Sequence, residues 1–100
     1  MRIPVMLAVA LAALPLAAHS QDNATARSLA ATCANCHGTD GRSVSPEVTP
    51  LAGFPKDLIV QRMNEFKNGK RPATVMHQLA KGYTDQQIDL IAGYFAAQRR

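Results

Sequence analysis

The sequence predicts a small all-α domain, and three observations support this fold class. Apolar residues recur every three or four positions in several segments, as expected for helices with one buried face. Thr84 and Gln87 have the spacing of a capping box, which is typical of a helix start. No segment shows the apolar and polar alternation of a half-buried strand. Because a domain of this length rarely buries enough apolar surface, we expect its helices to need a further stabilising element.

The stretch Cys33-Ala34-Asn35-Cys36-His37 has the C-x-x-C-H pattern of a haem attachment motif. Two thiols three positions apart can add to the two vinyl groups on one edge of a haem, and the next imidazole then reaches the iron. We therefore predict one haem c, covalently attached through Cys33 and Cys36, with His37 as an axial iron ligand. The helices would wrap around this haem, which supplies the missing apolar volume.

Other interpretations of the two cysteines remain open at this point. A thioredoxin-like dithiol is disfavoured because no strand pattern precedes the motif. A structural zinc site would need Cys33, Cys36, His37 and His77 as its four ligands, and the usual spacing of two ligand pairs is absent. A disulfide between Cys33 and Cys36 would close a very small loop and contribute little stability.

Residues 1–20 have the features of a cleaved secretory signal peptide. Arg2 precedes an apolar run over residues 3–16, and a small-x-small cleavage pattern ends at Ser20. The run contains two prolines and is shorter than the roughly 20 apolar residues that a membrane span requires. We expect cleavage after Ser20, one domain over residues 21–100, a periplasmic location and no membrane span.

The charge pattern argues against nucleic-acid binding. Eleven Lys and Arg stand against seven Asp and Glu, and aromatic residues are not interleaved with the basic ones. Four basic residues flank the segment that contains Met76. They either surround an exposed haem edge or form an ordinary solvated face. These residues are Lys67, Lys70, Arg71 and Lys81.

Four helices are expected after the leader. The first starts at a cap on Asp22 or Asn23 and delivers the cysteines. The second has Pro55 in its first turn and ends at Gly69. A short third helix covers residues 76–81 before Gly82, and the last follows Thr84. Their buried faces are expected to carry Ala26, Leu29, Ala30 and Cys33, then Leu58, Ile59, Met63 and Phe66, and finally Ile88, Ile91, Ala92 and Phe95.

The connections between these helices are expected to be irregular. Gly38 and Gly41 suggest tight turns with positive φ directly after the motif. Residues 42–49 read as a loop, and Pro72 favours an extended segment over residues 70–75.

Several motifs in this order resemble class I cytochrome c. They are Cys33 to Gly38, Pro50-Leu51-Ala52-Gly53, Met76, Tyr83-Thr84-Asp85 and Tyr94-Phe95. The resemblance covers residues 24–98 and implies a small haem-binding fold that transfers single electrons.

The resemblance also implies roles for individual residues around the haem. His37 would be the proximal ligand, with its other ring nitrogen donating to the carbonyl of Pro50. Leu51 would pack on the haem and Gly53 would permit close approach of the chain, although both residues also fit ordinary core and turn positions. Asp40, Arg42, Tyr83 and Tyr94 would hydrogen-bond the haem propionates or one another.

The distal iron ligand implied by the family pattern is Met76. The alternative is a methionine that merely fills space in the core, which is the role assigned to Met63. His77 competes with Met76 because imidazole is a strong iron ligand, yet adjacent residues of a helix point about 100° apart, so only one can face the iron. With Met76 on the iron, His77 would be a surface or rim residue.

Residues 66–76 and 80–85 are similar to the single-haem cytochrome subunits of flavocytochrome c sulfide dehydrogenases. This similarity implies an exported flavoprotein partner that oxidises sulfide, and a second cytochrome that accepts the electrons. Any catalysis on a substrate would then belong to the partner, which would dock on an apolar patch including Leu51, Ala73 and Val75. The alternatives are a free periplasmic electron shuttle and a haem-based sensor of small molecules.

Overall fold

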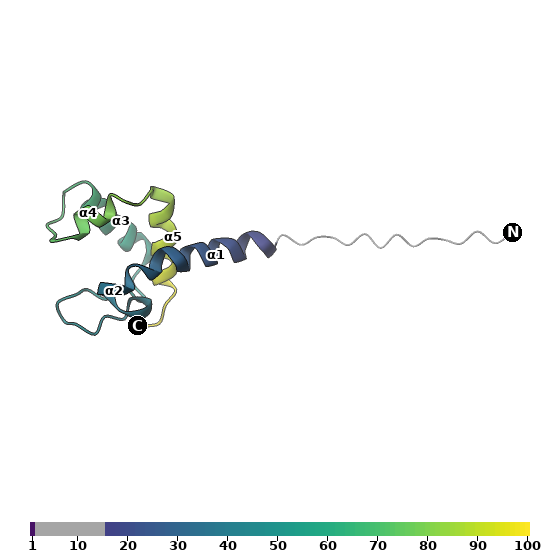
Figure 1. Ribbon diagram of the computed structural model, residues 1–100, viewed down its shortest axis with the longest axis horizontal. Helices are drawn as coiled ribbons and strands as arrows, with labels where there is room; N and C mark the ends of the chain where they lie inside the picture. Colours follow the sequence, from purple (N-terminus) through teal and green to yellow (C-terminus); the bar gives the residue numbers. More distant parts are fainter. Residues whose placement is uncertain (2–15) are drawn as a thin grey trace.

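The computed structural model describes Met1 and residues 16–100, and the regular secondary structure of the described part consists of helices joined by loops (Figure 1). The elements in chain order are α1 (Leu16–Ala31), α2 (Ala34–His37), the 3-10 turn η1 (Thr39–Gly41), α3 (Lys56–Lys67), α4 (Met76–Ala80) and α5 (Asp85–Ala96). No strand occurs in these residues, which confirms the all-α prediction. Residues 2–15 of the predicted signal peptide lie outside the described part, so cleavage after Ser20 stays a prediction.

Helix α5 is the centre of the packing. It lies against both α1 and α3, and α4 packs in turn on α3. Phe95 and Ile88 of α5 are each 1 % exposed and are the largest fully buried side chains. Among the residues whose burial the structure describes, five of the ten buried apolar ones are alanines, so the core is built largely from small side chains. A core with so little apolar volume agrees with the expectation that the helices alone are not enough.

The last helix follows the sequence prediction closely. The Thr84 hydroxyl accepts a hydrogen bond from the Gln87 amide at 3.1 Å, and the Gln87 side chain accepts one from the Thr84 amide at 2.9 Å. This reciprocal capping box fixes the start of α5. The predicted stripe of Ile88, Ile91, Ala92 and Phe95 is the buried face of the helix.

Helix α1 starts earlier than expected. Asp22 and Asn23 were predicted to cap it, but α1 already begins at Leu16, so both residues lie inside the helix. A capping side chain is needed only where the helical hydrogen bonds begin, and the residues upstream of Asp22 continue the helix. Within the described residues, none of the helices combines the length and the apolar character needed to cross a bilayer.

The two middle helices agree with the predicted segments. Pro55 occupies the N-cap position of α3, one residue before its expected place, and Ile59 and Met63 are buried on the face of α3 that was predicted. Helix α4 covers residues 76–80, and the Gly82 amide donates to the Leu79 carbonyl just after it. In Figure 1, α2 and α4 lie at the end of the molecule that faces away from the N-terminus, one below and one above.

Candidate functional site

The C-x-x-C-H motif forms one helical turn directly after α1. The Cys33 amide donates to the Ala30 carbonyl at 3.0 Å, and the His37 amide donates to the Cys33 carbonyl at 2.9 Å. Residues three apart on a helix share one side, so this turn presents both cysteines in the same general direction. Both thiols are free; Cys33 is half-buried against the core and Cys36 is exposed. Burial is the main cause that raises the pKa of the Cys33 thiol above its ordinary value.

The imidazole of His37 is oriented by the chain that follows it. Its Nδ1 lies 2.6 Å from the carbonyl oxygen of Thr49. The prediction of a ring-to-carbonyl hydrogen bond is therefore confirmed, but the acceptor is Thr49 and not Pro50. Pro50 follows immediately, so the motif pattern located the right turn and missed the carbonyl by one residue. When Nδ1 donates to this carbonyl, the other ring nitrogen, Nε2, is left as an acceptor suited to a metal.

Tight turns carry the chain away from the motif, as the two glycines predicted. Gly38 has φ of 84° and Gly41 has φ of 80°. A Cβ atom on Gly38 would lie 2.2 Å from the Arg42 carbonyl oxygen, which is far inside contact distance. Asp40 between them also has positive φ, at 54°. Asp tolerates this region better than most residues, which explains its position between the two glycines.

Leu51 and Gly53 lie where this loop meets the core. The Leu51 amide donates to the Gly41 carbonyl at 2.8 Å, and the Leu51 side chain is half-buried against the core. Gly53 has φ of 74°, and a Cβ there would lie 2.7 Å from Cγ of Arg100. The predicted close approach at Gly53 therefore exists, and it is made to the C-terminal segment. Contact between Leu51 and the haem stays a prediction.

Met76 and His77 are the first two residues of α4. Met76 is half-buried and packs on the edge of the core, whereas Met63 is fully buried as predicted for a packing residue. His77 is also half-buried, and its Nδ1 is shielded from solvent without a hydrogen-bond partner. The expectation of a surface or rim position for His77 stays a prediction; in the structure its side chain is partly covered because α4 packs on α3.

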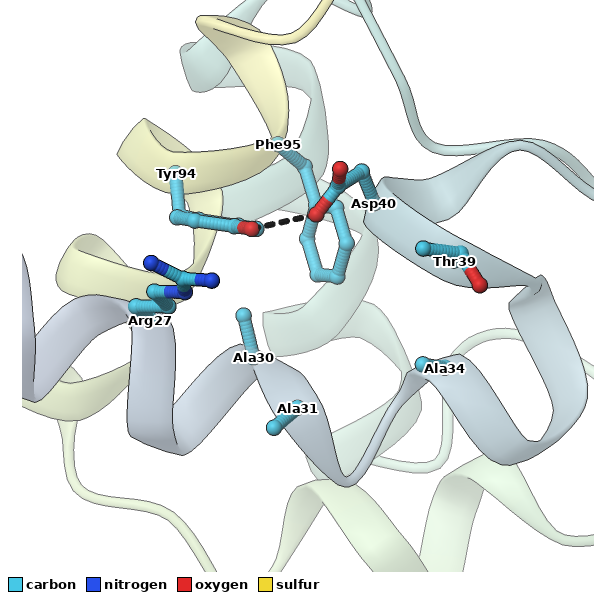
Figure 2. A pocket seen from close by; sticks show the side chains of 8 residues that line it. All are labelled: Arg27, Ala30, Ala31, Ala34, Thr39, Asp40, Tyr94 and Phe95. Atoms are coloured by element: carbon cyan, nitrogen blue, oxygen red, sulfur yellow. Dashed lines mark hydrogen bonds between the residues drawn. The ribbon is translucent and has the colours of Figure 1, made fainter.

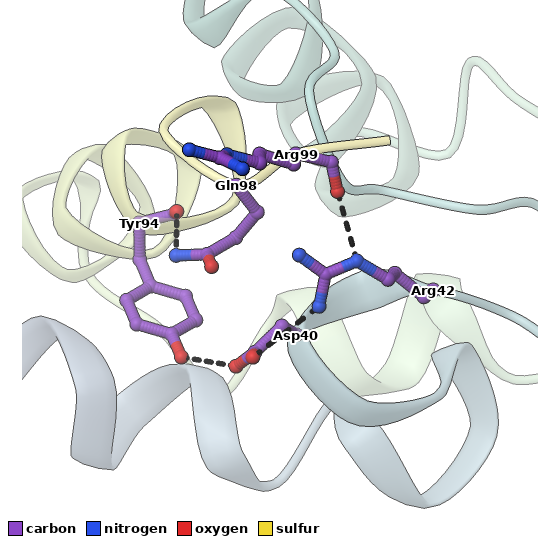
Figure 3. Close-up of polar contacts among 5 residues, drawn as sticks. All are labelled: Asp40, Arg42, Tyr94, Gln98 and Arg99. Carbon is purple, nitrogen blue, oxygen red and sulfur yellow. Dashed lines mark hydrogen bonds and ion pairs between the residues drawn. The ribbon is translucent and has the colours of Figure 1, made fainter.

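A polar network ties the loop after the motif to the end of α5 (Figure 3). The Tyr94 hydroxyl donates a short hydrogen bond to the Asp40 carboxylate, and Arg42 pairs with the same carboxylate at 3.5 Å. Nε of Arg42 donates to the Arg99 carbonyl at 2.9 Å. The bond to Asp40 is the main cause that raises the pKa of Tyr94. Of the two predicted possibilities, these residues bond one another in the structure.

Sequence reasoning named Asp40, Arg42 and Tyr94 as possible partners of one another, but it could not assign the individual bonds. Asp40 and Tyr94 are 54 positions apart, and no local pattern links them. Tyr83 likewise bonds to the hydroxyl of Thr32, across 51 positions, at 3.0 Å. The only local signal was the left-handed turn at residues 38–41, which places a carboxylate at a fixed point beside α5.

Two cavities in the described part of the chain are lined by residues other than Cys33, Cys36 and His37. One of about 170 Å³ lies behind the motif, between α1, α2, η1 and α5 (Figure 2). Its walls are Arg27, Ala30, Ala31, Ala34, Thr39, Asp40, Tyr94 and Phe95. A second, of about 490 Å³, lies between the outer parts of α1 and α5. Cys33, Cys36, His37 and Met76 line neither of these two cavities. Cys36 is exposed and the other three are half-buried, so these side chains lie on a surface that is partly open to solvent.

This open surface fits a haem. Apolar side chains next to the core remain half-exposed on it, among them Cys33, Leu51, Phe66, Met76 and Tyr83. A flat apolar group that joins the motif to α4 would cover such side chains. Among the described residues, no group of three or more Cys, His, Asp and Glu is placed to bind a metal ion by itself.

Comparisons with known proteins give a consistent result. The sequence profile of the cytochrome c family matches residues 23–98. The cytochrome subunit of sulfide dehydrogenase from Chlorobaculum tepidum is 48 % identical over 67 residues, which are 67 % of this chain and 60 % of that protein. Cytochrome c4 of Pseudomonas aeruginosa is 36 % identical over 98 residues, or 98 % of this chain and 49 % of that protein. The chain thus spans about half to three fifths of these relatives.

Proposed function

Because this chain belongs to the cytochrome c family and is an electron-transfer protein with covalently bound haem c, we propose that His37 and Met76 are its two axial iron ligands. Cys33 and Cys36 form the thioether bonds. The observation that carries the proposal is the hydrogen bond from the His37 ring to the Thr49 carbonyl, which turns Nε2 into the available ligand atom.

The bound haem supplies a one-electron couple, and the surrounding residues set its properties. The Thr49 carbonyl holds His37 in one tautomer and one ring orientation, so Nε2 stays the nitrogen that would bind the iron. Met76 offers a neutral thioether, which favours the ferrous state compared with a second imidazole. With both axial positions filled, no substrate reaches the iron, and the protein passes electrons through the exposed edge. The predicted signal peptide supports a periplasmic site of action.

The ligand assignment is tested by comparing two neighbouring substitutions. Met76→Ala should leave the haem attached, remove the weak long-wavelength band of iron-thioether ligation, lower the reduction potential and let carbon monoxide bind the ferrous form. His77→Ala is the matched control and should leave all four properties unchanged. The opposite pattern would transfer the distal role to His77. Carbon monoxide binding by the unmodified protein would favour the haem-based sensor.

We further propose that the protein is the haem subunit of a sulfide-oxidising flavoprotein complex. The Chlorobaculum tepidum relative is named as the cytochrome subunit of a sulfide dehydrogenase, which supports a role in sulfide oxidation, and the surface beside Met76 supports a subunit contact. Val75 and Leu79 are each about half exposed next to the proposed ligand, and Ala73 is exposed as well. Exposed apolar residues around a redox centre are typical of a protein contact.

The basic residues next to this surface are only partly available. Lys67 and Arg71 bond to Tyr83, Asp85 and Glu65 of the same chain. Lys70 and Lys81 are exposed and form no ion pair among the described residues. An apolar centre with two lysines at its rim favours a subunit contact over a free shuttle, which would rely on a larger basic face.

Purification from the native source at high salt tests the partner. Co-elution with a flavin-containing chain, together with sulfide-dependent reduction of the haem, would support the subunit proposal. Val75→Asp should then lower the rate of haem reduction by more than about fivefold. Val44→Asp is the control and should have little effect, because the Val44 side chain is fully exposed and lies outside the proposed contact surface. A lone monomer that sulfide does not reduce would identify a free carrier. One relative, named a thiosulfate dehydrogenase electron acceptor, is consistent with that alternative.

A further inference from the structure

The segment before Met76 is fastened to α3 at one point. Residues 72–75 are all exposed, so they contribute almost no packing that would fix their path. Arg71, just before them, is about one-third exposed and contacts Glu65 of α3, with its Nε 2.8 Å from the carboxylate. The main-chain carbonyl of Glu65 also accepts hydrogen bonds from the amides of Lys70 at 2.9 Å and Arg71 at 3.3 Å. Glu65 therefore holds both the backbone and the side chain at this point.

The segment after α4 is fastened to the same helix. Nζ of Lys67 donates to the Tyr83 carbonyl at 2.5 Å and lies 3.9 Å from the Asp85 carboxylate. Lys67 and Glu65 are both in the last turn of α3. The short helix α4, with Met76 at its start, is thus bracketed by one charge-assisted contact on each side. Only Ala80 within α4 is fully buried.

We propose that Arg71 is a positioning residue, which keeps the Met76 thioether on the iron by anchoring the exposed segment to Glu65. This inference rests on the proposed ligation by Met76. With residues 72–75 otherwise unpacked, loss of the Arg71 contact raises the fraction of molecules in which Met76 has left the iron. Any external ligand for the iron binds that open fraction, so its apparent affinity reports the population directly.

The chain contains a matched control for this contact. Arg62 also pairs with the Glu65 carboxylate, at 3.3 Å, but from the same helix and three residues earlier. Arg62→Met removes a similar charge and a similar contact to Glu65 without freeing the segment before Met76. Arg71→Met removes the same kind of charge and does free it. A difference between these two variants therefore measures anchoring and not charge.

Imidazole binding to the oxidised, haem-loaded protein is the test. Arg71→Met should bind imidazole about fivefold more tightly than the unmodified protein, which is the size expected for a partly exposed ion pair. Arg62→Met should stay within about twofold. Arg71→Lys keeps the charge and should recover part of the difference. In parallel, hydrogen exchange at the amides of Lys70 and Arg71 should accelerate in Arg71→Met only.

The outcomes separate this inference from the ligand assignment. If the unmodified protein has the iron-thioether band and Arg71→Met and Arg62→Met bind imidazole equally, the positioning role of Arg71 is wrong while Met76 remains the ligand. If Met76→Ala keeps the band, both proposals fail. Tighter imidazole binding with unchanged exchange at residues 70 and 71 would also contradict anchoring by Glu65.

Discussion

The regions on the two sides of α5 differ in how completely their apolar side chains are buried. On the side of α1, the interior is closed: Ala30 and Ile91 are each 2 % exposed, and Phe95 is 1 % exposed. On the side of the motif and α4, apolar side chains such as Leu51, Phe66 and Met76 are only half-buried. The first region holds itself together by packing, and the second is held mainly by hydrogen bonds and ion pairs at its edges.

This contrast indicates which part of the protein depends on the cofactor. The crossing of α1 and α5 buries much of its own apolar surface, so it is the part of the protein that depends least on a bound group. On the other side, His37, the two free thiols of Cys33 and Cys36, and Met76 lie near apolar side chains that the chain leaves half-buried. The chain is thus closely packed on one side of α5, and on the other side it leaves apolar side chains that a bound haem would cover.

The largest effect is expected from breaking the closed region. Phe95→Ala removes a fully buried ring at the contact between α1, α5 and the loop containing Gly41. Such a truncation should lower the free energy of unfolding by about 3–5 kcal/mol in the haem-loaded protein, as measured by denaturant titration. Val44→Ala is the control, since Val44 is fully exposed, and should change the value by less than about 0.5 kcal/mol. Similar losses for both variants would contradict the contrast.

The next effect concerns the turn that follows the motif. Gly38→Ala would place a Cβ 2.2 Å from the Arg42 carbonyl oxygen, so the backbone around His37 must shift. We expect a changed visible spectrum and loss of several-fold in haem-loaded yield. Gly69→Ala is the matched control, because Gly69 has φ of 74° and nothing within 4 Å of the added Cβ. It should cost only about 1 kcal/mol and leave the spectrum intact. Equal spectra for the two variants would contradict the tight turn.

A smaller effect is expected where the two regions are tied together. Tyr94→Phe removes the bond to Asp40 and should lower the free energy of unfolding by about 1 kcal/mol near neutral pH. Because the pKa of Tyr94 is raised in the folded state, this stabilisation is complete below the unfolded pKa of about 10 and is lost as the pH rises through the folded pKa. The stability curves of Tyr94→Phe and the unmodified protein should therefore converge in strong alkali.

A double-mutant cycle checks the origin of that effect. Asp40→Asn keeps a residue that tolerates positive φ and removes the carboxylate. In this background Tyr94→Phe should cost clearly less than in the unmodified chain. A Tyr94→Phe effect that is the same in both backgrounds, or that persists undiminished in strong alkali, would show that Asp40 is not its cause.

The closed region was largely predictable from the sequence. The capping pattern at Thr84 and Gln87 and the stripe from Ile88 to Phe95 are local signals, and the structure confirms them. The start of α1 was not predictable from a capping residue, because Leu16 to Gln21 continue the helix without a break at Asp22. Hydrogen bonding within a helix is local, so local sequence patterns predict a helix well where a capping residue marks its end.

The candidate site was predictable in its residues but not in its contacts. The attachment motif identified Cys33, Cys36 and His37, and the turn at Pro50 located the neighbourhood of the His37 acceptor. The choice of Thr49, the bond from Tyr94 to Asp40 and the anchoring of Arg71 by Glu65 depend on how distant segments pack. Sequence spacing alone does not identify such pairs, whether they are six positions apart, as Glu65 and Arg71 are, or 54 apart, as Asp40 and Tyr94 are.

Covalent attachment of the haem through Cys33 and Cys36 is tested most directly by acid-acetone extraction of the purified protein and of Cys33→Ala/Cys36→Ala. The haem should stay with the unmodified polypeptide and should be absent from the double variant. Without haem the double variant should be largely unfolded. Hydrogen exchange should show this as a loss of protection that includes α4 and the 42–50 loop. Extractable haem in the unmodified protein, or a haem-free double variant that is as well protected as the original, would contradict a fold built around this cofactor.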